Sequence, residues 1–322
     1  MKNHAFLIAT HAFPEQLEDI VNLLEASNHF FFIHIDKKSK KMLSSEPVAR
    51  LKRKENVIIL DSMAVYHAGF SQVACTLRLF EEAYRYERCP MDYFHLISGQ
   101  DYPCMSNSDF DAVFEHHEKS FMHFDTPEEI EKYRKRTYPL PQQSYVRKTI
   151  YFRFIDLHIP FLPSKIRRVL IKSLNLIARI YKREPINDMV GGWNWFSWHR
   201  QVVEYVLEFV KNNQKYIRRF NFSYSADELI FHTILYDKAD KLNIKNDSLR
   251  FVEWHPREGE TLGHNYASRK YLIHPRLLDE REYDKIVKSG AIFCRKIHPV
   301  HSAKLVALLK KRTLCQQCNE KP

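Results

Sequence analysis

The 322-residue chain is 44% hydrophobic and has only 7 glycines, so it has enough apolar material for a sizeable core and is not a disordered or fibrous protein. Its formal net charge of +11 is unevenly distributed. Residues 132–183 hold 14 lysines and arginines against one acid, Asp156, a net charge of +13, whereas the rest of the chain carries −2. This insert-like segment predicts an anionic partner, such as phosphate, a membrane surface or nucleic acid.

The start of the sequence and the cysteines predict a cytoplasmic protein. The apolar run Ala5 to Ala9 is too short for the core of a signal peptide or for a membrane span. Without an export signal, we expect the six cysteines to be reduced thiols. Cys315 and Cys318 form one C-x-x-C pair with no second pair, which is a weak metal signal near a chain end where fraying is the simpler interpretation.

The first sixty residues predict strand, helix and strand with short connections, which indicates an α/β fold with a partly parallel sheet and helices on its faces. His11 and Asp36 follow neighbouring predicted strands, so we expect them at the same edge of the sheet, where an acid suits a hydrogen bond to a ribose or a base. The chain contains neither a G-x-G-x-x-G motif nor a P-loop, which excludes the usual dinucleotide fingerprint. The predicted segments are strands at 5–9, 30–35 and 57–60 and a helix that opens at Pro14.

The apolar run Tyr93 to Ile97 predicts another buried strand. The run ends at Gly99, where a side chain would hinder the turn. Asp101 then lies just beyond the end of the strand. A carboxylate there is a candidate substrate-binding group, because ligands of open α/β sheets lie beyond the carboxyl ends of the strands. The simpler alternative is a structural turn after a buried strand.

Asp109 and Asp111 spell a D-x-D, a pattern that holds a metal in many sugar-nucleotide enzymes. We do not assign them that role. Ser108 is typical of a helix N-cap, and carboxylates in a first helical turn suit the helix dipole. We therefore expect no metal at this motif.

The basic segment contains an amphipathic helix from about Ile166 to Tyr181, with lysines and arginines around an apolar stripe. Such a helix suits an anionic membrane surface, and an ordinary helix packed on the core is the equal alternative. We expect one catalytic domain over residues 1–300 with a basic helical insert at about 132–183, followed by a C-terminal helix and tail over 301–322. A strand at 120–124 is also expected before the insert.

The second half of the chain holds most of the candidate chemistry. The run 191–198 puts three tryptophans beside a glycine pair, which favours either a sugar- or base-binding groove or a core strand. Asp227 and Glu228 precede an apolar helical run. Glu228 is either the last residue of a capping box that starts at Ser225 or a general base in a cleft. Arg276 and Lys296 are cations that suit a diphosphate leaving group where no metal is held, or that are simply solvated.

Eight short motifs occur in a consistent order between Ala5 and Lys296: HIDKKS, VYHAGFSQV, HLISGQDYP, GGWNWFSWHR, SADELIFHTIL, FVEW, HPR and IFCRK. Together they resemble the core-2/I-branching glycosyltransferases, which include β-1,6-N-acetylglucosaminyltransferases, peptide xylosyltransferases and bacterial relatives. The resemblance implies a GT-A-type fold, an inverting mechanism, a UDP-sugar donor and no required metal or other cofactor.

The resemblance also implies roles for single residues. Glu228 is the expected base, and Arg276, where the family more often has lysine, is expected to bind the diphosphate with Lys296. The remaining substrate-binding candidates are His11 and Asp36 on the uridine side, Trp254 on the acceptor side, and Asp101, Trp195 and Asp227.

The expected reaction moves a sugar to a hydroxyl of a glycan or lipid-linked glycan, and N-acetylglucosamine is the first candidate for that sugar. The alternatives are a UDP-xylose-dependent enzyme and a non-catalytic basic module for membrane or nucleic acid. Nucleic acid is not expected as a partner, because no reader motif is present.

Overall fold

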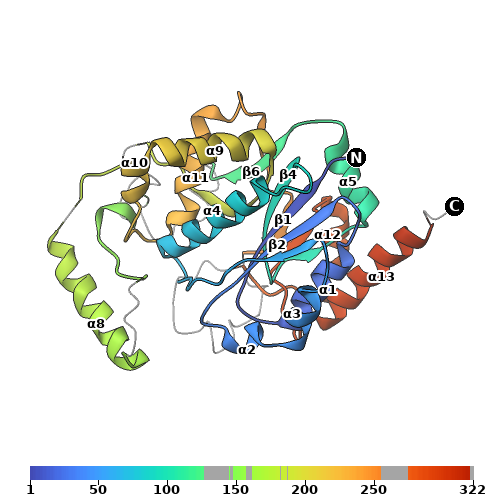
Figure 1. Ribbon diagram of the computed structural model, residues 1–322, viewed down its shortest axis with the longest axis horizontal. Coiled ribbons are helices and arrows are strands. Elements are labelled where there is room, and N and C mark those ends of the chain that lie inside the picture. The colour runs from blue at the N-terminus through green and yellow to red at the C-terminus, as the bar shows by residue number, and fades with distance from the viewer. Residues whose placement is uncertain are drawn as a thin grey trace.

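The computed structural model describes residues 1–126, 145, 148–156, 162–181, 183–186, 188–254 and 275–319, of which the side chains at 164, 179 and 315–319 are left aside. Most of the basic segment before residue 148 therefore lies outside the described residues. The described chain forms a mixed sheet with helices on both faces (Figure 1).

The main sheet has seven strands in the order β3-β2-β1-β4-β7-β6-β8. Strands β3, β2, β1 and β4 are parallel to one another, β7 is antiparallel to both β4 and β6, and β8 is parallel to β6. The strands are β1 His4–Thr10, β2 His29–Ile35, β3 Val57–Ile59, β4 Tyr93–Ser98, β6 Ser120–Phe124, β7 Gly192–His199 and β8 Ile244–Asn246. The expected α/β fold with a mostly parallel sheet is confirmed.

A second, three-stranded sheet has the order β5-β10-β9, in which β10 is antiparallel to β5 and parallel to β9. Its strands are β5 Tyr102–Pro103, β9 Arg250–Val252 and β10 Phe293–Arg295. Because β5 directly follows β4, this small sheet lies next to the carboxyl end of β4.

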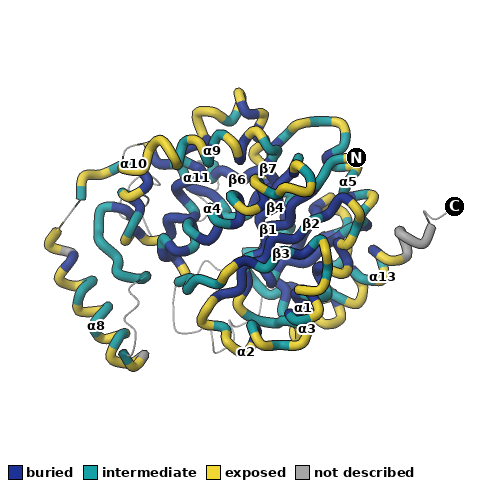
Figure 2. The backbone as a smooth tube through the Cα atoms, viewed as in Figure 1, coloured by how far each residue is buried: buried dark blue, intermediate teal, exposed yellow. Residues whose placement is uncertain are grey.

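Helices cover both faces of the main sheet (Figures 1 and 2). On β1, Ala5 and Leu7 pack toward one face, and Phe6 and Ile8 pack toward the other. The first face is covered by α4 Phe70–Tyr84, α9 Arg200–Asn212 and α11 Ile230–Leu235, and the second by α1 Pro14–Leu23, α3 Glu46–Leu51, α5 Asn107–Glu115, α12 Tyr283–Ser289 and α13 Ala303–Asn319. Burial on both faces explains why β1, β2 and β4 are near-continuous apolar runs.

Shorter helices and 3₁₀ turns complete the described residues, and α8 extends away from the body of the molecule (Figure 1). The short helices are α2 Lys40–Leu43 and α10 Gln214–Arg218. The 3₁₀ turns are Ala178–Ile180, Ala226–Glu228, Tyr236–Lys238 and Glu280–Glu282, and α8 spans Ser164–Ile177.

Two capping predictions were wrong. Helix α5 starts at Asn107, and its N-cap is Ser106, whose hydroxyl accepts from the Asp109 amide at 3.2 Å, so Ser108 is not the cap and Asp111 lies beyond the first turn. The capping box at Ser225, one of the two alternatives for Glu228, does not form either. Ser225 is in the left-handed region at φ 52°, its side chain caps nothing, and residues 226–228 make a 3₁₀ turn before α11.

Asp156, the single acid of the basic segment, caps helix α4. Its carboxylate accepts from the Phe70 amide at 2.7 Å and from the Ser71 amide at 3.3 Å. Carboxylates at a helix start satisfy free amides and complement the helix dipole. The basic segment is therefore tied to the main body at this point.

Candidate active site at the carboxyl edge of the sheet

Parallel strands bring the first candidates together as expected. The last residue of β1, Thr10, pairs with Ile35 of β2, so His11 and Asp36 follow neighbouring strand ends. The Asp36 carboxylate accepts from the Lys38 amide at 2.9 Å and pairs with the Lys38 ammonium at 2.5 Å. Desolvation lowers the pKa of His11, Lys296 lowers it further, and Asp36 opposes the change. An open hollow of about 470 Å³ adjoins this edge, lined by residues that include His11 and Lys38.

The strand that ends at Ser98 delivers Asp101 to the same edge, but into the protein. Asp101 is fully buried, and both carboxylate oxygens accept from the Arg295 guanidinium, at 2.8 and 2.9 Å. One of these oxygens also accepts from the hydroxyl of Ser98 at 2.7 Å. A side chain on Gly99 would overlap Thr10, as expected for this tight turn. Asp101 thus positions Arg295 rather than facing solvent.

Arg295 connects this ion pair to an aromatic wall. Its guanidinium lies 3.5 Å from the centre of the Trp195 ring, close enough for a cation–π contact. Trp193 and Trp195 lie 5.4 and 6.4 Å from Trp254, centre to centre. Trp198, in contrast, is fully buried and stacks on Phe196 at 3.7 Å, so this strand contains one core tryptophan beside the half-buried Trp193 and Trp195.

The two candidate diphosphate-binding cations are neighbours. The Lys296 amide donates to the Arg276 carbonyl at 3.3 Å, and the Arg276 amide donates to Glu253, the residue before Trp254, at 2.7 Å. Desolvation and the charge of Arg295 lower the pKa of Lys296. The Arg276 side chain is itself paired with the buried Glu282 at 3.1 Å.

Glu228 lies at the end of the 3₁₀ turn with its side chain 46% exposed, and it pairs with Lys148 at 2.9 Å. Burial favours the neutral form of Lys148, but Glu228, together with Asp227 and Asp125, outweighs burial and raises the Lys148 pKa. Lys148 belongs to the basic segment and is 80 residues away in sequence, so no local pattern could have identified it.

Asp227 is buried beside Glu228. Burial and the negative charge of Glu228 raise the pKa of Asp227 to about 7. One of its oxygens accepts from Asn194 on β7 at 3.0 Å, and the other has no hydrogen-bond partner within the described residues. Neighbouring side chains alternate on a strand, so Asn194 and the tryptophans beside it point to opposite faces of the sheet. Asp227 and Glu228 therefore lie on one face of the sheet at this edge, and Trp193 and Trp195 lie on the other.

Comparison with known proteins places the chain in a family. The model of the Core-2/I-Branching enzyme family matches residues 4–287. The chain belongs to the Core-2/I-branching enzyme family. The mixed, mostly parallel sheet with helices on both faces agrees with the α/β fold that the resemblance implied for this family member.

Curated relatives of this family member include xylosyltransferase 2 of Canis lupus familiaris, 23% identical over 79% of this chain and 27% of the relative. Human xylosyltransferase 1 is 23% identical over 95% of this chain and 30% of the relative. The family member thus spans less than a third of the length of these relatives. Among solved structures, S. aureus TarS 1–349 in complex with UDP-GlcNAc matches with a TM-score of 0.29 and 14% identity, covering 66% of this chain and 48% of TarS.

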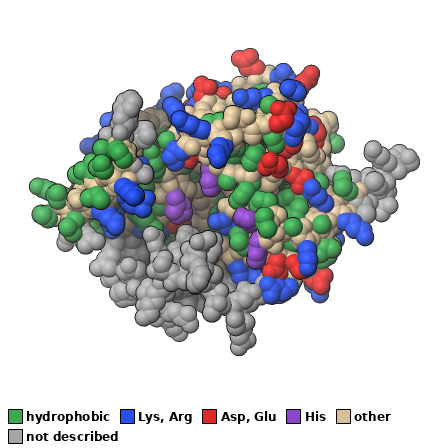
Figure 3. Space-filling model, turned by 90° about the horizontal axis from the view of Figure 1, so that it is seen from below, with side chains coloured by type: hydrophobic (Ala, Val, Ile, Leu, Met, Phe, Trp, Pro, Cys, Tyr) green, Lys and Arg blue, Asp and Glu red, His purple; other side chains and the backbone are tan. Residues whose placement is uncertain are grey.

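Among the described residues, no helix of the family member combines the length and the apolar character needed to cross a bilayer. The described cysteines Cys75, Cys89, Cys104 and Cys294 are free thiols. Helix α8 leaves large apolar side chains at the surface, where they mix with basic ones at the left of the molecule in Figure 3. On this helix, those with more than half of their surface exposed are Ile166, Val169, Leu176 and Ile177, and Ile180 and Tyr181 just after the helix are also exposed.

Proposed function

We propose that this chain is an inverting glycosyltransferase that moves N-acetylglucosamine from UDP-N-acetylglucosamine to a hydroxyl of a glycan, without a metal ion. The observation that carries the proposal is the Glu228 carboxylate, which is half exposed and held by the largely buried Lys148 at the edge where the strand-end residues converge. A carboxylate that is fixed on one side and open on the other suits a general base.

In the proposed reaction, Glu228 takes the proton of the acceptor hydroxyl as its oxygen attacks the anomeric carbon. The bond from that carbon to the diphosphate breaks, and its electron pair leaves with UDP. Lys296 and Arg276 would meet the charge that develops on the diphosphate, and His11 and Asp36 would contact the uridine. A single displacement of this kind inverts the anomeric centre. Trp254 and Trp195 offer ring faces for sugar packing.

Xylose is the second candidate for the transferred sugar, because the curated relatives described above are named xylosyltransferases. N-acetylglucosamine and xylose differ at C2 and C5 of the sugar. The test is thermal unfolding of the full chain with UDP-N-acetylglucosamine, UDP-xylose, UDP and GDP-mannose in EDTA. We expect UDP-N-acetylglucosamine to raise the unfolding midpoint most and GDP-mannose to leave it unchanged. A larger rise with UDP-xylose would replace the donor assignment, and no rise with any uridine compound would contradict the proposal.

We also propose that α8 brings the enzyme to an anionic membrane that carries a lipid-linked acceptor. The exposed apolar side chains of α8, 55% to 64% accessible, argue against the alternative of a helix whose stripe packs on the core. The exposed Lys165, Arg168 and Lys172 on the same helix add charge complementarity to anionic headgroups. The helix stays joined to the body through Asn175, whose side chain accepts from the Phe154 amide at 2.9 Å, and through the contact of Arg167 with Tyr66.

A further inference from the structure

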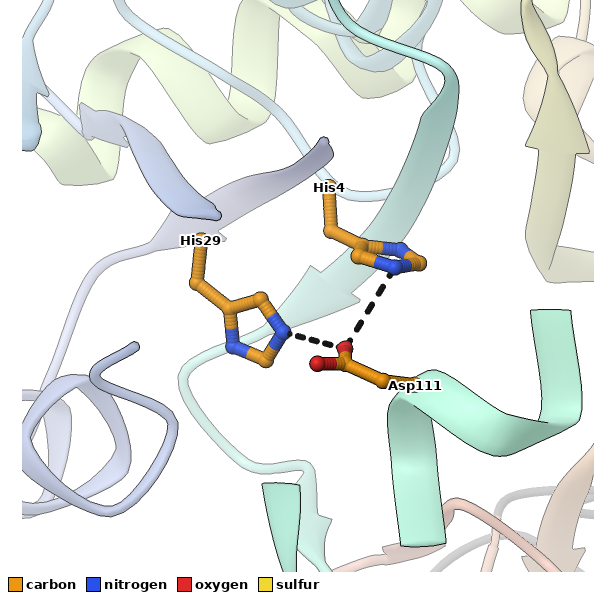
Figure 4. Close-up of side chains that lie close together, drawn as sticks. All are labelled: His4, His29 and Asp111. Carbon is orange, nitrogen blue, oxygen red and sulfur yellow. Dashed lines mark hydrogen bonds and ion pairs between the residues drawn. The ribbon is translucent and has the colours of Figure 1, made fainter. Parts of the chain in front are cut away.

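Three metal-ligating side chains meet at the opposite, amino-terminal edge of the sheet. His4 is the first residue of β1, His29 is its register partner at the start of β2, and Asp111 lies on α5 (Figure 4). One Asp111 oxygen lies 2.8 Å from Nε2 of His29 and 3.4 Å from Nε2 of His4. The three ligand atoms all lie within 4.8 Å of one another. No part of the proposed reaction uses this cluster. Asp111 is, however, the second acid of the D-x-D motif at which the sequence predicted no metal, so a metal here would reverse that prediction.

Both ring nitrogens of His29 face hydrogen-bond acceptors, Nδ1 the Leu24 carbonyl and Nε2 the Asp111 carboxylate. Its Nδ1 lies 2.6 Å from the Leu24 carbonyl, which can only accept, so Nδ1 carries the proton. In a neutral ring, Nε2 then presents a lone pair to the carboxylate of Asp111 at 2.8 Å. Two acceptors face each other unless a proton or a metal cation lies between them.

His4 is arranged in the same way. The side chain is 1% exposed, and its Nε2 has no hydrogen-bond partner within the described residues although it points at Asp111 (Figure 4). Its other nitrogen, Nδ1, lies 3.0 Å from Nε2 of His95, whose Nδ1 lies 2.9 Å from the Ser197 hydroxyl. If His4 donates to His95 and His95 donates to Ser197, Nε2 of His4 is left with a free lone pair.

We propose that His4, His29 and Asp111 bind one divalent transition-metal ion, Zn²⁺ in first place. Two imidazoles and a carboxylate are a ligand set that Zn²⁺ accepts, with bonds of about 2.0–2.2 Å. Tetrahedral bonds of that length separate neighbouring ligand atoms by about 3.3 Å. The 3.4 Å gap between His4 and Asp111 matches this, the 2.8 Å gap between His29 and Asp111 would widen on binding, and the two imidazole nitrogens lie within 4.8 Å of each other. The Asp111 side chain is 17% exposed, so solvent supplies the fourth ligand.

The surroundings fit a metal site. Zinc-bound histidines usually give their remaining N–H to a carbonyl, a carboxylate or another acceptor, which fixes the ring. Here the Leu24 carbonyl and the His95 ring fill that role, and Asn28 donates to the second Asp111 oxygen at 3.2 Å. The ion would join the starts of β1 and β2 to α5, so its role is stability rather than catalysis.

The test is titration of the full chain, freed of metal with a chelator and then dialysed, with Zn²⁺ and with Co²⁺ as a spectroscopic probe. We expect one ion per chain, a higher unfolding midpoint with metal, and visible Co²⁺ absorption of a low-coordinate site. Asp111→Asn should weaken the affinity at least about 10-fold. Asp109→Asn, two residues away on the same helix, is the matched control and should bind like the unchanged chain.

If a variant fails to fold, metal binding to the unchanged chain still decides the question. Absence of stoichiometric Zn²⁺ and Co²⁺ binding to it would overturn the proposal and leave a protonated His29 paired with Asp111. Binding that Asp111→Asn and His29→Gln leave unaltered would also overturn it. UDP affinity should be the same in the metal-free and metal-loaded chain, since the two edges lie at opposite strand ends. A metal requirement for UDP would therefore contradict this placement of the ion.

Discussion

Glu228 is paired with a residue that lies far away in the sequence. Its carboxylate is open to solvent on one side, and Lys148 holds the other side at 2.9 Å. The neighbouring Asp227 is buried, so the two adjacent carboxylates differ in environment. Separation of two acids by environment is a common way to give them different roles. We assign the base role to Glu228 because it is the accessible one.

Glu228→Gln should lower the turnover of sugar transfer by about 10²–10⁴-fold, because glutamine cannot accept the proton. Glutamine still offers Lys148 an oxygen acceptor, so the local structure and the UDP affinity should stay nearly unchanged. The measurement pairs transfer kinetics with UDP titration, and Glu208→Gln on the exposed side of α9 serves as the control. Near-normal turnover of the variant would show that Glu228 is only a structural residue.

Asp227 makes stability depend on pH. Its pKa is raised to about 7 in the folded chain against an ordinary 3.8, so between these values the folded state binds more protons than the unfolded state. Stability from this group is therefore fully present below about pH 4 and declines as the pH rises toward 7. Asp227→Asn should flatten this decline in thermal unfolding curves recorded from pH 5 to 8. An unchanged slope would show that the carboxyl titrates normally.

At the scale of elements, Arg295 links the small sheet to the end of β4. It emerges from β10, pairs with the buried Asp101 and covers the Trp195 ring, which lies on β7. A buried charge that loses its partner is strongly destabilising, whereas replacement of both charges often is not. The ion pair therefore matters mainly for the relative placement of three strands that border the candidate site.

Arg295→Met should lower the free energy of unfolding by about 3–5 kcal/mol, because Asp101 is left charged and buried. The double variant Arg295→Met/Asp101→Asn should recover most of that loss. Lys304→Met is the control, since its pair with Glu280 is exposed and contributes at most about 1 kcal/mol. Denaturant unfolding of the unchanged chain, the single variants Arg295→Met and Asp101→Asn, and the double variant measures the coupling, and additive effects of the two substitutions would refute it.

The sequence predicted the parallel half of the main sheet well and the rest of the architecture less well. Strands β1, β2 and β4 are buried on both faces, so they read as apolar runs, and parallel pairing places His11 and Asp36 together. The partners of Asp101 and Glu228 lie 194 and 80 residues away, so no local pattern specifies them. The same holds for the capping box at Ser225, which a left-handed residue replaces.

Helix α8 gives a prediction for the basic segment as a whole. The chain should co-sediment with anionic vesicles at low salt, less so at high salt, and not with neutral vesicles, because exposed charges are screened over about 8–10 Å at physiological ionic strength. Val169→Glu/Ile177→Glu should abolish this binding. Leu308→Gln, at an exposed apolar position on α13, should not. Equal binding to both vesicle types, or none to either, would leave α8 as a solvated helix.

At the scale of the whole molecule, the two edges of the sheet carry different kinds of charged and metal-ligating groups. At the carboxyl edge, the described carboxylates that follow β2 and β4 are already paired, Asp36 with Lys38 and Asp101 with Arg295. Within the described residues, the group of three potential metal ligands, His4, His29 and Asp111, lies at the other edge. The site edge instead brings Lys296 and Arg276 together through their backbones, and the Arg276 side chain is itself paired with the buried Glu282. Cations there suit a diphosphate directly.

We therefore expect UDP to bind equally well in EDTA and in Mg²⁺ or Mn²⁺, because in the proposed site protein cations rather than a metal ion would face the diphosphate. Calorimetric titration of the full chain under the three conditions measures this. Lys296→Met should weaken UDP binding in all of them and lower turnover by about 10²–10³-fold, the usual effect of removing one electrostatic contact to a developing charge. Lys288→Met on α12, an exposed lysine, should do neither. Binding that requires Mg²⁺ or Mn²⁺ would show that the diphosphate is held through a metal, and the cation pair would lose its proposed role.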